Sequence, residues 1–380
     1  MKYFDVVVIG SGPSGGGAAF KLAESGLSVA IIEKEKLPRY KTCGGGLVYR
    51  GRTILPFDIS EVIEREFFQV DTLVGEGYHF ITRREEPIIS MVMRDTFDEL
   101  IVKKVKEKGG VIIDDCKLTG LRNEDGKVIL STTGGEITAR FVIAADGALS
   151  PTAKMAGWDK DTRYLVPALE YEIEVPEEDF ERLSKTVRFD IDAIPGGYAW
   201  NFPKKNHLSI GVAAVKRGKI NLKKYYLEYL ETLGIKTIIS EQQHGFQVPI
   251  APRTDGFVKN NVFLVGDAAG FADPITAEGI SNSIYSGLLA ADAIIESNMD
   301  VELAGTIYNE KLDEKLVPEL KTGLLLAKFL YSQPTIRNLF MKKYGYHYFE
   351  SMADVFMGKR SYPVDIMKTI KQKAKGLLFS

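Results

Sequence analysis

YFDVVVIGSGPSGGGAAFKLAESGLSVAIIEKE, residues 3–35, is the stretch that decides the fold of this chain. It opens with an apolar run typical of a buried strand, passes through a cluster of glycines, and closes with a second apolar run. The spacing predicts a helix over 13–24, with Pro13 in its first turn and Gly26 as its end. A strand, a glycine turn, a helix and a second strand in this order predict an α/β fold with a Rossmann-like domain that binds a dinucleotide.

The glycines of this stretch have separate physical roles. Gly10, Gly12 and Gly15 fit the pattern G-x-G-x-x-G. Gly10 permits the tight turn, Gly12 lets the backbone approach a pyrophosphate, and Gly15 allows close packing of helix on strand. Ser14 lies in the same phosphate-facing helix start. Glu33 ends the second strand and can accept hydrogen bonds from ribose hydroxyls, which favours FAD or NAD over NADP.

The composition excludes several classes of protein. The 380 residues are 45% hydrophobic and 26% charged, enough to bury a large core, and the net charge of −2 argues against nucleic acid as a partner. The two cysteines, Cys43 and Cys116, are too few for a disulfide framework and indicate a reducing compartment, although one long-range disulfide stays open. Without a visible signal peptide, spanning segment or metal motif, we expect a cytoplasmic protein with no metal site.

A second nucleotide-binding signal lies at NNVFLVGDAAGFADPITAEGISNSIYSGLLAADAI, residues 260–294. A strand ends at Asp267, and a helix begins near Gly279 and Ile280. An acid at a strand end followed by a helix N-terminus suits a polar, phosphate-bearing molecule. The positive end of the helix at Gly279 and Ile280 would lie near a flavin ring, where reduction leaves negative charge.

Together the two signals resemble FAD enzymes of the para-hydroxybenzoate hydroxylase-like fold. In that fold the GD segment contacts the FAD, which implies this role for Asp267. RDTFDELIVKKVKEKG, residues 94–109, resembles the R-x-x-F-D-x-x-L segment of these enzymes and implies that Arg94 lies near the FAD.

The segment FVIAADGALSPTAKMAG, residues 141–157, resembles the D-G segment of the same enzymes through Asp146 and Gly147. The arginine usual near its end is Lys154 here. There is no second complete G-x-G-x-x-G unit. We therefore expect either transient binding of NAD(P)H or an electron-donor protein such as reduced ferredoxin.

The loop PRYKTCGGGL, residues 38–47, fits P-x-x-K-x-C-G-x-x-L and resembles the geranylgeranyl reductase family. There the loop passes beside the isoalloxazine ring, and bare glycine backbone permits close approach to a flat ring. The resemblance assigns Lys41, Cys43, Gly44, Gly45 and Gly46 to the cofactor site. Cys43 is also a candidate redox or proton-handling group. The alternative is a small residue chosen for packing.

A second feature of that family is the motif Y-x-W-x-F-P, which Tyr198, Trp200, Phe202 and Pro203 fit. In a strand Tyr198, Trp200 and Phe202 project from one face and form an apolar wall suited to a polyisoprenoid. We assign these four residues to the substrate site. The alternative is ordinary sheet core.

The motifs divide the chain into an FAD-binding domain, an inserted antiparallel-sheet substrate domain (α+β), and a helical C-terminal region. The predicted bounds are 1–70, 94–157 and 245–300 for the first, 71–93 and 158–244 for the second, and 301–380 for the third. Residues 321–380 carry eight more positive than negative charges, interleaved with apolar clusters. They indicate either docking on an anionic membrane or a solvated helical cap.

The resemblance implies a flavoprotein that saturates isoprenoid C=C bonds by hydride transfer from reduced FAD and protonation. The sequence does not identify the acid: Tyr198, Cys43 and water are candidates. The substrate could be a prenylated glycerol ether lipid, a prenyl diphosphate, a prenylated quinone or a chlorophyll tail. The C-terminus favours a membrane lipid, as for archaeal-type digeranylgeranylglycerophospholipid reductases, and a protein peripheral on the membrane.

Two other functions remain open. An FAD monooxygenase or halogenase would share the fold, and a halogenase W-x-W-x-I-P element is similar to YAWNFP here. Against a hydroxylase, the histidine that often follows GDAA is Gly270. A non-catalytic prenyl-lipid binding protein would be expected to have eroded flavin motifs, whereas these are intact.

Overall fold

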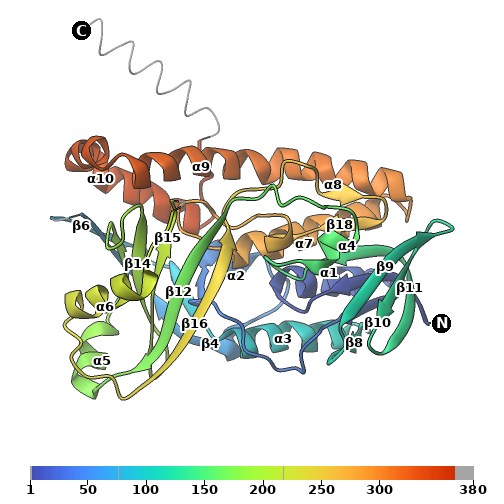
Figure 1. Cartoon of the computed structure of the whole chain (residues 1–380), viewed down its shortest axis with the longest axis horizontal. Helices are drawn as coiled ribbons and strands as arrows, with labels where there is room; N and C mark the ends of the chain where they lie inside the picture. The colour runs from blue at the N-terminus through green and yellow to red at the C-terminus, as the bar shows by residue number, and fades with distance from the viewer. Residues whose placement is uncertain (1, 76, 217, 364–380) are drawn as a thin grey trace, which may run out of the picture.

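The computed structural model describes residues 2–75, 77–216 and 218–363. Two sheets lie at opposite ends of the molecule, and the helices α8, α9 and α10 run along one edge that joins them (Figure 1). No helix in these described ranges combines the length and apolar character that crossing a bilayer requires.

The first sheet has eight strands, with β17, β18, β11, β1, β2 and β8 in spatial order and the pair β10, β9 attached to β11. The strands β18, β11, β1, β2 and β8 are parallel to one another. Val6, Val7 and Val8 are fully buried in the middle of this sheet, as an apolar run in a parallel strand requires. The strands are β1 Lys2–Ile9, β2 Val29–Ile32, β8 Val111–Ile113, β9 Leu118–Glu124, β10 Lys127–Thr132, β11 Gly135–Ala144, β17 Val258–Lys259 and β18 Val262–Leu264.

The second sheet has seven strands in the order β16, β12, β15, β14, β13, β5 and β6. It is antiparallel as predicted except for one pair, since β13 runs parallel to β5. The strands are β5 Gln69–Val74, β6 Tyr78–Arg83, β12 Leu165–Glu174, β13 Val187–Ile191, β14 Gly197–Pro203, β15 Leu208–Ala214 and β16 Ser240–Pro249. Three further strands, β3 Gly46–Val48, β7 Ile89–Val92 and β4 Ile63–Phe67, form a small sheet that begins at the glycine loop.

The helices fill the faces and the edge. They are α1 Pro13–Glu24, α2 Tyr49–Thr53, α3 Arg94–Glu107, α4 Pro151–Met155, α5 Glu177–Leu183, α6 Leu222–Thr232, α7 Ile280–Glu296, α8 Val301–Lys315, α9 Val317–Ser332 and α10 Pro334–Phe356, with 3₁₀ turns η1 Ser60–Val62 and η2 Gly266–Ala268. Arg337 is fully buried and ties α10 to the second sheet through an ion pair with Asp192.

The predicted elements agree closely with the observed ones. The helix predicted over 13–24 is α1, and the helix predicted from Gly279 begins at Ile280. Residues 301–363 are mostly helical as expected, while 364–380, which hold part of the basic excess, lie outside the described residues. The division into domains stays a prediction. The second sheet extends to Pro249, beyond the expected boundary at 244.

Three glycine contacts hold α1 against its neighbours. A Cβ on Gly15 would lie 2.0 Å from the carbonyl oxygen of Gly10, and one on Gly16 would lie 2.4 Å from Cγ2 of Ile101 in α3. From α7, a Cβ on Gly287 would lie 2.1 Å from the carbonyl oxygen of Ser14. The backbone of α1 therefore touches the turn after β1 and α7, and the Ile101 side chain of α3 lies directly on α1.

We predict that Gly287→Ala destabilises the protein by about 1–3 kcal/mol, because the added methyl group forces α7 away from α1. Gly17→Ala is the matched control at the same helix pair. Its Cβ would lie 3.6 Å from Ile284, an ordinary contact, so its effect should be neutral or slightly stabilising. Urea unfolding of both variants and the wild type measures the difference. Equal midpoints for the two variants would contradict the packing argument.

Candidate functional site

A cavity of about 1070 Å³ lies between the two sheets and contains most of the predicted site residues. One end is formed by the turn after β1 and by the end of β2. The other end is formed by the glycine loop, 38–46, and by the aromatic face of β14. A long bipartite molecule, polar at one end and flat at the other, fits such a shape.

The turn after β1 leaves open space only where a ligand is expected. Gly10 has a φ of +103°, and a Cβ there would lie 2.5 Å from the carbonyl oxygen of Ala145. At Gly12 the nearest atoms to a Cβ would be guanidinium nitrogens of Arg94 and Arg39, at 3.6 and 3.9 Å. Gly15 packs against the strand and does not line the cavity. The place above Gly12 is thus bare backbone flanked by two cations, which suits a diphosphate.

Glu33 lies at the end of β2, buried, with a carboxylate that lines the cavity. Its Oε2 accepts hydrogen bonds from the backbone N–H and the hydroxyl of Ser11, at 3.0 and 2.7 Å. Burial alone would raise the pKa of Glu33, but the Ser11 hydroxyl and Arg39 lower it below its usual range. The carboxylate therefore stays ionised as an acceptor for ribose hydroxyls.

Asp98 joins two arginines beside the diphosphate position. Arg94 donates to both carboxylate oxygens of Asp98 at 2.8 Å, and Arg39 donates to Oδ2 at 3.0 Å. Burial would lower the pKa of Arg94, but Asp98 and the nearby Cys43 side chain raise it, so the guanidinium stays charged. The sequence analysis missed Arg39 and Asp98, since nothing in their spacing shows that they meet.

Asp267 lies in the η2 turn and lines the cavity. Burial raises the pKa of Asp267, while Lys41 and Arg94 oppose this shift. The same turn is fixed by Arg163, which donates to the carbonyls of Asp267 and Ala148, both at 2.6 Å. Arg163, also missed from the sequence, thus joins the GD and D-G segments into one wall.

The start of α7 meets the cavity at Gly279 and Ile280, as predicted. Its positive end is not wholly free, because the N–H of Ser281 donates to the Glu278 carboxylate at 2.8 Å. Burial raises the pKa of Glu278, and Arg50 opposes this. Part of the helix charge is therefore offset within the chain.

The glycine loop lacks side chains at 44–46 because its backbone packs directly against other parts of the chain. A Cβ on Gly44 would lie 3.0 Å from Phe202 and 3.2 Å from Nε1 of Trp200. Gly45 has a φ of +67°, and its Cβ would lie 2.2 Å from Nζ of the fully buried Lys204. Lys204 donates to the carbonyls of Gly44 and Val92, at 2.6 and 3.0 Å. The loop lines the cavity, but packing against β14 and β7 already requires its glycines, before any ring is considered.

Cys43 lines the cavity and is half-buried. Its backbone N–H donates to Oε1 of Glu170 in β12 at 2.9 Å, and its sulfur accepts from the N–H of Gly45 at 3.4 Å. Both cysteines are free, so the disulfide that Cys43 and Cys116 would allow is not formed.

Lys41 also lines the cavity, with Nζ 3.8 Å above the ring of Phe246. Burial is the main cause that lowers the pKa of Lys41.

The aromatic wall has the predicted geometry. Tyr198, Trp200 and Phe202 share one face of β14 and all line the cavity, with successive ring centroids 5.9 and 6.1 Å apart. Pro203 falls on the opposite face and does not line it. The hydroxyl of Tyr198 donates to the carbonyl of Thr276 at 2.5 Å. Burial, with Asp273 and Cys43, raises the pKa of Tyr198, which makes its phenol a weak proton donor.

The predicted cofactor residues that line this cavity are Gly10, Gly12, Ser14, Glu33, Lys41, Cys43, Gly44, Gly45, Gly46, Arg94, Asp267, Gly279 and Ile280. Asp146 and Gly147 line it as well, and Asp146 accepts from the hydroxyl of Ser150 at 2.5 Å. The bare backbone at Gly12, its two flanking cations and the ionised acid at Glu33 together fit FAD. Direct contact of each residue with the cofactor stays a prediction.

Comparison with known proteins identifies the family of the chain. The family model described as FAD dependent oxidoreductase matches residues 5–225. The chain is therefore a member of the FAD-dependent oxidoreductase family, and FAD is its cofactor.

Its relatives define the branch of that family. The chain is 31% identical to geranylgeranyl diphosphate reductase, chloroplastic, from Arabidopsis thaliana, over 96% of this chain and 83% of the relative. It is 30% identical to digeranylgeranylglycerophospholipid reductase 1 from Methanopyrus kandleri, over 86% of this chain and 90% of the relative. The chain thus falls in the geranylgeranyl reductase family, as its cysteine loop and aromatic motif predicted.

Solved structures share the fold. A geranylgeranyl bacteriochlorophyll reductase-like protein from Thermoplasma acidophilum superposes with a TM-score of 0.76 at 24% identity, covering 94% of this chain and 92% of the other. A probable FAD-dependent monooxygenase and a halogenase are also similar, at 17% and 18% identity, which shows the fold alone.

We predict that Arg94→Met weakens FAD binding about 10- to 100-fold, because a charge-assisted hydrogen bond contributes about 1.5–3 kcal/mol. Methionine keeps the length of the side chain, and Asp98 keeps its bond to Arg39. Quenching of flavin fluorescence on titration into apoprotein measures the dissociation constant. Lys103→Met, which removes an exposed cation from the same helix, is the control and should bind FAD like the wild type. An unchanged constant for the Arg94 variant would contradict its role.

Proposed function

We propose that this protein saturates C=C bonds in geranylgeranyl chains of a membrane lipid, of the digeranylgeranylglycerophospholipid class. The names of the relatives, which refer to geranylgeranyl diphosphate and to digeranylgeranylglycerophospholipid, support a geranylgeranyl substrate. The lipid rather than the diphosphate is favoured by the surface of the C-terminal helices, described below.

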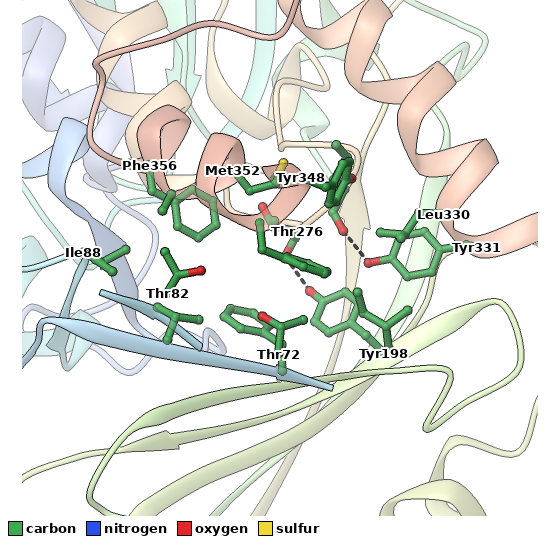
Figure 2. A pocket seen from close by; sticks show the side chains of 16 residues that line it. Thr72, Thr82, Ile88, Tyr198, Thr276, Leu330, Tyr331, Tyr348, Met352 and Phe356 are labelled. Carbon is green, nitrogen blue, oxygen red and sulfur yellow. Dashed lines mark hydrogen bonds between the residues drawn. The ribbon is translucent and has the colours of Figure 1, made fainter. Parts of the chain in front are cut away.

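The observation that carries the proposal is a second, apolar cavity of about 60 Å³ next to the first. It lies between the second sheet and the helices α9 and α10 (Figure 2). The two cavities share Phe189, Tyr198, Thr276 and Phe356. With the reacting bond at the Cys43 loop, the tail would run along the aromatic wall of the larger cavity, and the second cavity would keep its last few carbons out of water.

Side chains of α9 and α10 close this second cavity. Leu330 and Tyr331 come from α9, and Met352 and Phe356 come from α10, as Figure 2 shows. The hydroxyl of Tyr331 donates to the carbonyl of Ile275 at 2.6 Å, which turns the apolar part of its ring to the cavity. Adding bulk on α10 should therefore shorten the space available to a tail.

The residues that line the larger cavity have separate proposed roles in the reaction. When bound and reduced, FAD supplies a hydride to one carbon of the alkene. Lys41 and Arg94 provide positive charge near the cofactor, and Arg94 is held in place by Asp98. The aromatic face of β14 excludes water from the reacting bond. Electrons for the cofactor would come from NAD(P)H or a reduced redox protein, and Cys43 stays a candidate for redox or proton handling.

The outer surface of α9 and α10 is suited to an anionic membrane. Ile336 and Leu339 are 58% and 69% exposed, and Leu325 is 49% exposed. The lysines Lys321, Lys328, Lys342 and Lys343 are exposed on the same two helices. Apolar side chains can insert among the acyl chains while the lysines meet lipid phosphates. Such a surface supports a lipid entrance beside the apolar cavity.

We predict that dithionite-reduced protein saturates a digeranylgeranyl glycerophospholipid without oxygen, seen by mass spectrometry as gains of H₂. Ala353→Phe should lower the rate at least about tenfold, because Ala353 is buried in the wall of the second cavity and a phenyl ring would fill it. His347→Phe adds the same ring at an exposed position of α10 and is the control.

Oxygen-dependent modification of a substrate, with no saturation under anaerobic conditions, would overturn this function and favour a monooxygenase or halogenase. Saturation of geranylgeranyl diphosphate but not of the glycerophospholipid would support the proposed reaction and show that the substrate is the diphosphate.

We also predict that the protein sediments with vesicles containing anionic phospholipid and less with neutral vesicles. Ile336→Ser with Leu339→Ser should weaken this binding about tenfold or more, since each side chain loses apolar burial in the lipid. Leu227→Ser removes a side chain that is 49% exposed on α6, at the far side of the second sheet (Figure 1), and should have no effect. Equal sedimentation of the wild type and both variants would show that the outer surface of α9 and α10 does not bind the membrane.

A further inference from the structure

Glu170 is a buried acid in the wall of the large cavity, and the mechanism above leaves it without a role. It belongs to β12 and is 3% exposed, yet it lines the cavity. In the register of the sheet it is paired with Gly211, which is in turn paired with Trp200. Its carboxyl group therefore lies on the same face as the aromatic wall, beside the proposed position of the alkene.

Two hydrogen-bond donors on the glycine loop hold the carboxyl group of Glu170. The N–H of Cys43 donates to Oε1 at 2.9 Å, and the hydroxyl of Tyr40 donates to the same oxygen at 3.1 Å. Among the described residues no hydrogen bond to Oε2 is found. One oxygen is thus fixed against the loop, and the other remains for a proton that points into the cavity.

The surroundings of Glu170 favour the protonated form. Titratable groups face it from its own strand (Glu172), the loop (Tyr40, Lys41, Cys43), the end of β14 (Lys204) and the neighbouring strand β16 (His244). Burial raises the pKa of Glu170 to about 7, Glu172 adds to this, and the Cys43 N–H, Lys204 and Tyr40 oppose it. Lys204 gives its hydrogen bonds to two carbonyls, and no other cation among the described residues forms an ion pair with Glu170.

We propose that Glu170 is the proton donor for C=C saturation, with its carboxyl held at the cavity by the loop that carries Cys43. This inference rests on the function proposed above. In the step, the O–H bond of Glu170 breaks and a C–H bond forms at one alkene carbon, while the hydride that reduced FAD supplies forms the other C–H bond. The two electrons come from the cofactor, and Glu170 is left as a carboxylate.

Tyr40 gives a route for returning the proton. Its side chain is 40% exposed, and its hydroxyl already donates to Glu170. Its ring stacks on His244 with centroids 4.3 Å apart, which keeps the hydroxyl in place. A proton from water can therefore reach the carboxylate through this hydroxyl without crossing the apolar wall.

The test is Glu170→Gln in the FAD-loaded protein. The amide oxygen still accepts from the Cys43 N–H, so the loop keeps its position, but the side chain has no proton to give. We expect FAD affinity to be unchanged and the rate of saturation of a digeranylgeranyl glycerophospholipid to fall at least about 100-fold. The wild-type rate should fall about tenfold per pH unit above pH 7, where Glu170 is deprotonated.

Glu172→Gln is the matched control. Glu172 lies two residues along the same strand, with Oε2 2.9 Å from Nε2 of His207. Removing its charge should leave saturation active and move the fall in rate to lower pH, because Glu172 contributes to the raised pKa of Glu170.

A readout independent of turnover is the carboxylic acid C=O band in the infrared difference spectrum. The band should be present at pH 5, disappear with a midpoint near pH 7, and be missing in Glu170→Gln. If the wild type and Glu170→Gln saturate equally, or if no such band is seen, Glu170 is only a positioning residue and this inference fails alone. If the wild type saturates no prenyl chain at all, the proposed function fails and this inference fails with it.

Discussion

The close backbone contact around α1 is the constraint on which the rest of the structure depends. Glycines let the backbone of this helix touch the turn after β1 and the backbone of α7, and let the Ile101 side chain of α3 lie directly on it. Because α3 begins at Arg94 and α7 begins at Ile280, these contacts bring a cation and a helix end to the cavity together with the phosphate-facing turn. Glycine is costly within a helix, and the burial of almost every residue of α1 offsets that cost.

The polarity of the cavity differs between its two ends, because the charged side chains have different partners at each end. At one end Glu33 and the pair of arginines on Asp98 form an ionised, hydrogen-bonded cluster suited to ribose and diphosphate. At the other end Lys204 bonds to carbonyls and the aromatic rings of β14 face inward, so Lys41 and the Glu170 carboxyl meet the cavity among apolar side chains. A polar cofactor and an apolar substrate can therefore meet at the glycine loop without sharing their surroundings.

Patterns within short stretches of sequence predicted the fold well. Contacts between residues far apart in the chain could not be predicted in this way. The limits of α1 follow from Pro13 and from glycines close in sequence, and alternation placed Tyr198, Trp200 and Phe202 on one face. In contrast, the bond from Arg39 to Asp98 and the bond from Cys43 to Glu170 join residues far apart in the chain, and no spacing encodes them. The glycine loop was predicted for approach to a ring, whereas contacts with Phe202 and Lys204, distant in the chain, already require it.

The order of strands in the first sheet has a consequence for synthesis of the chain. β1, made first, lies beside β11, and β11 lies beside β18, so the sheet is incomplete until residue 264 has been made. The same core includes Leu312 and Leu320 of the last helices. A ribosome must therefore release most of the polypeptide before Val6, Val7 and Val8 can be covered. Folding of this protein is consequently a late event, and β1 stays only partly covered in the nascent chain until the later segments are made, a state that chaperones can protect.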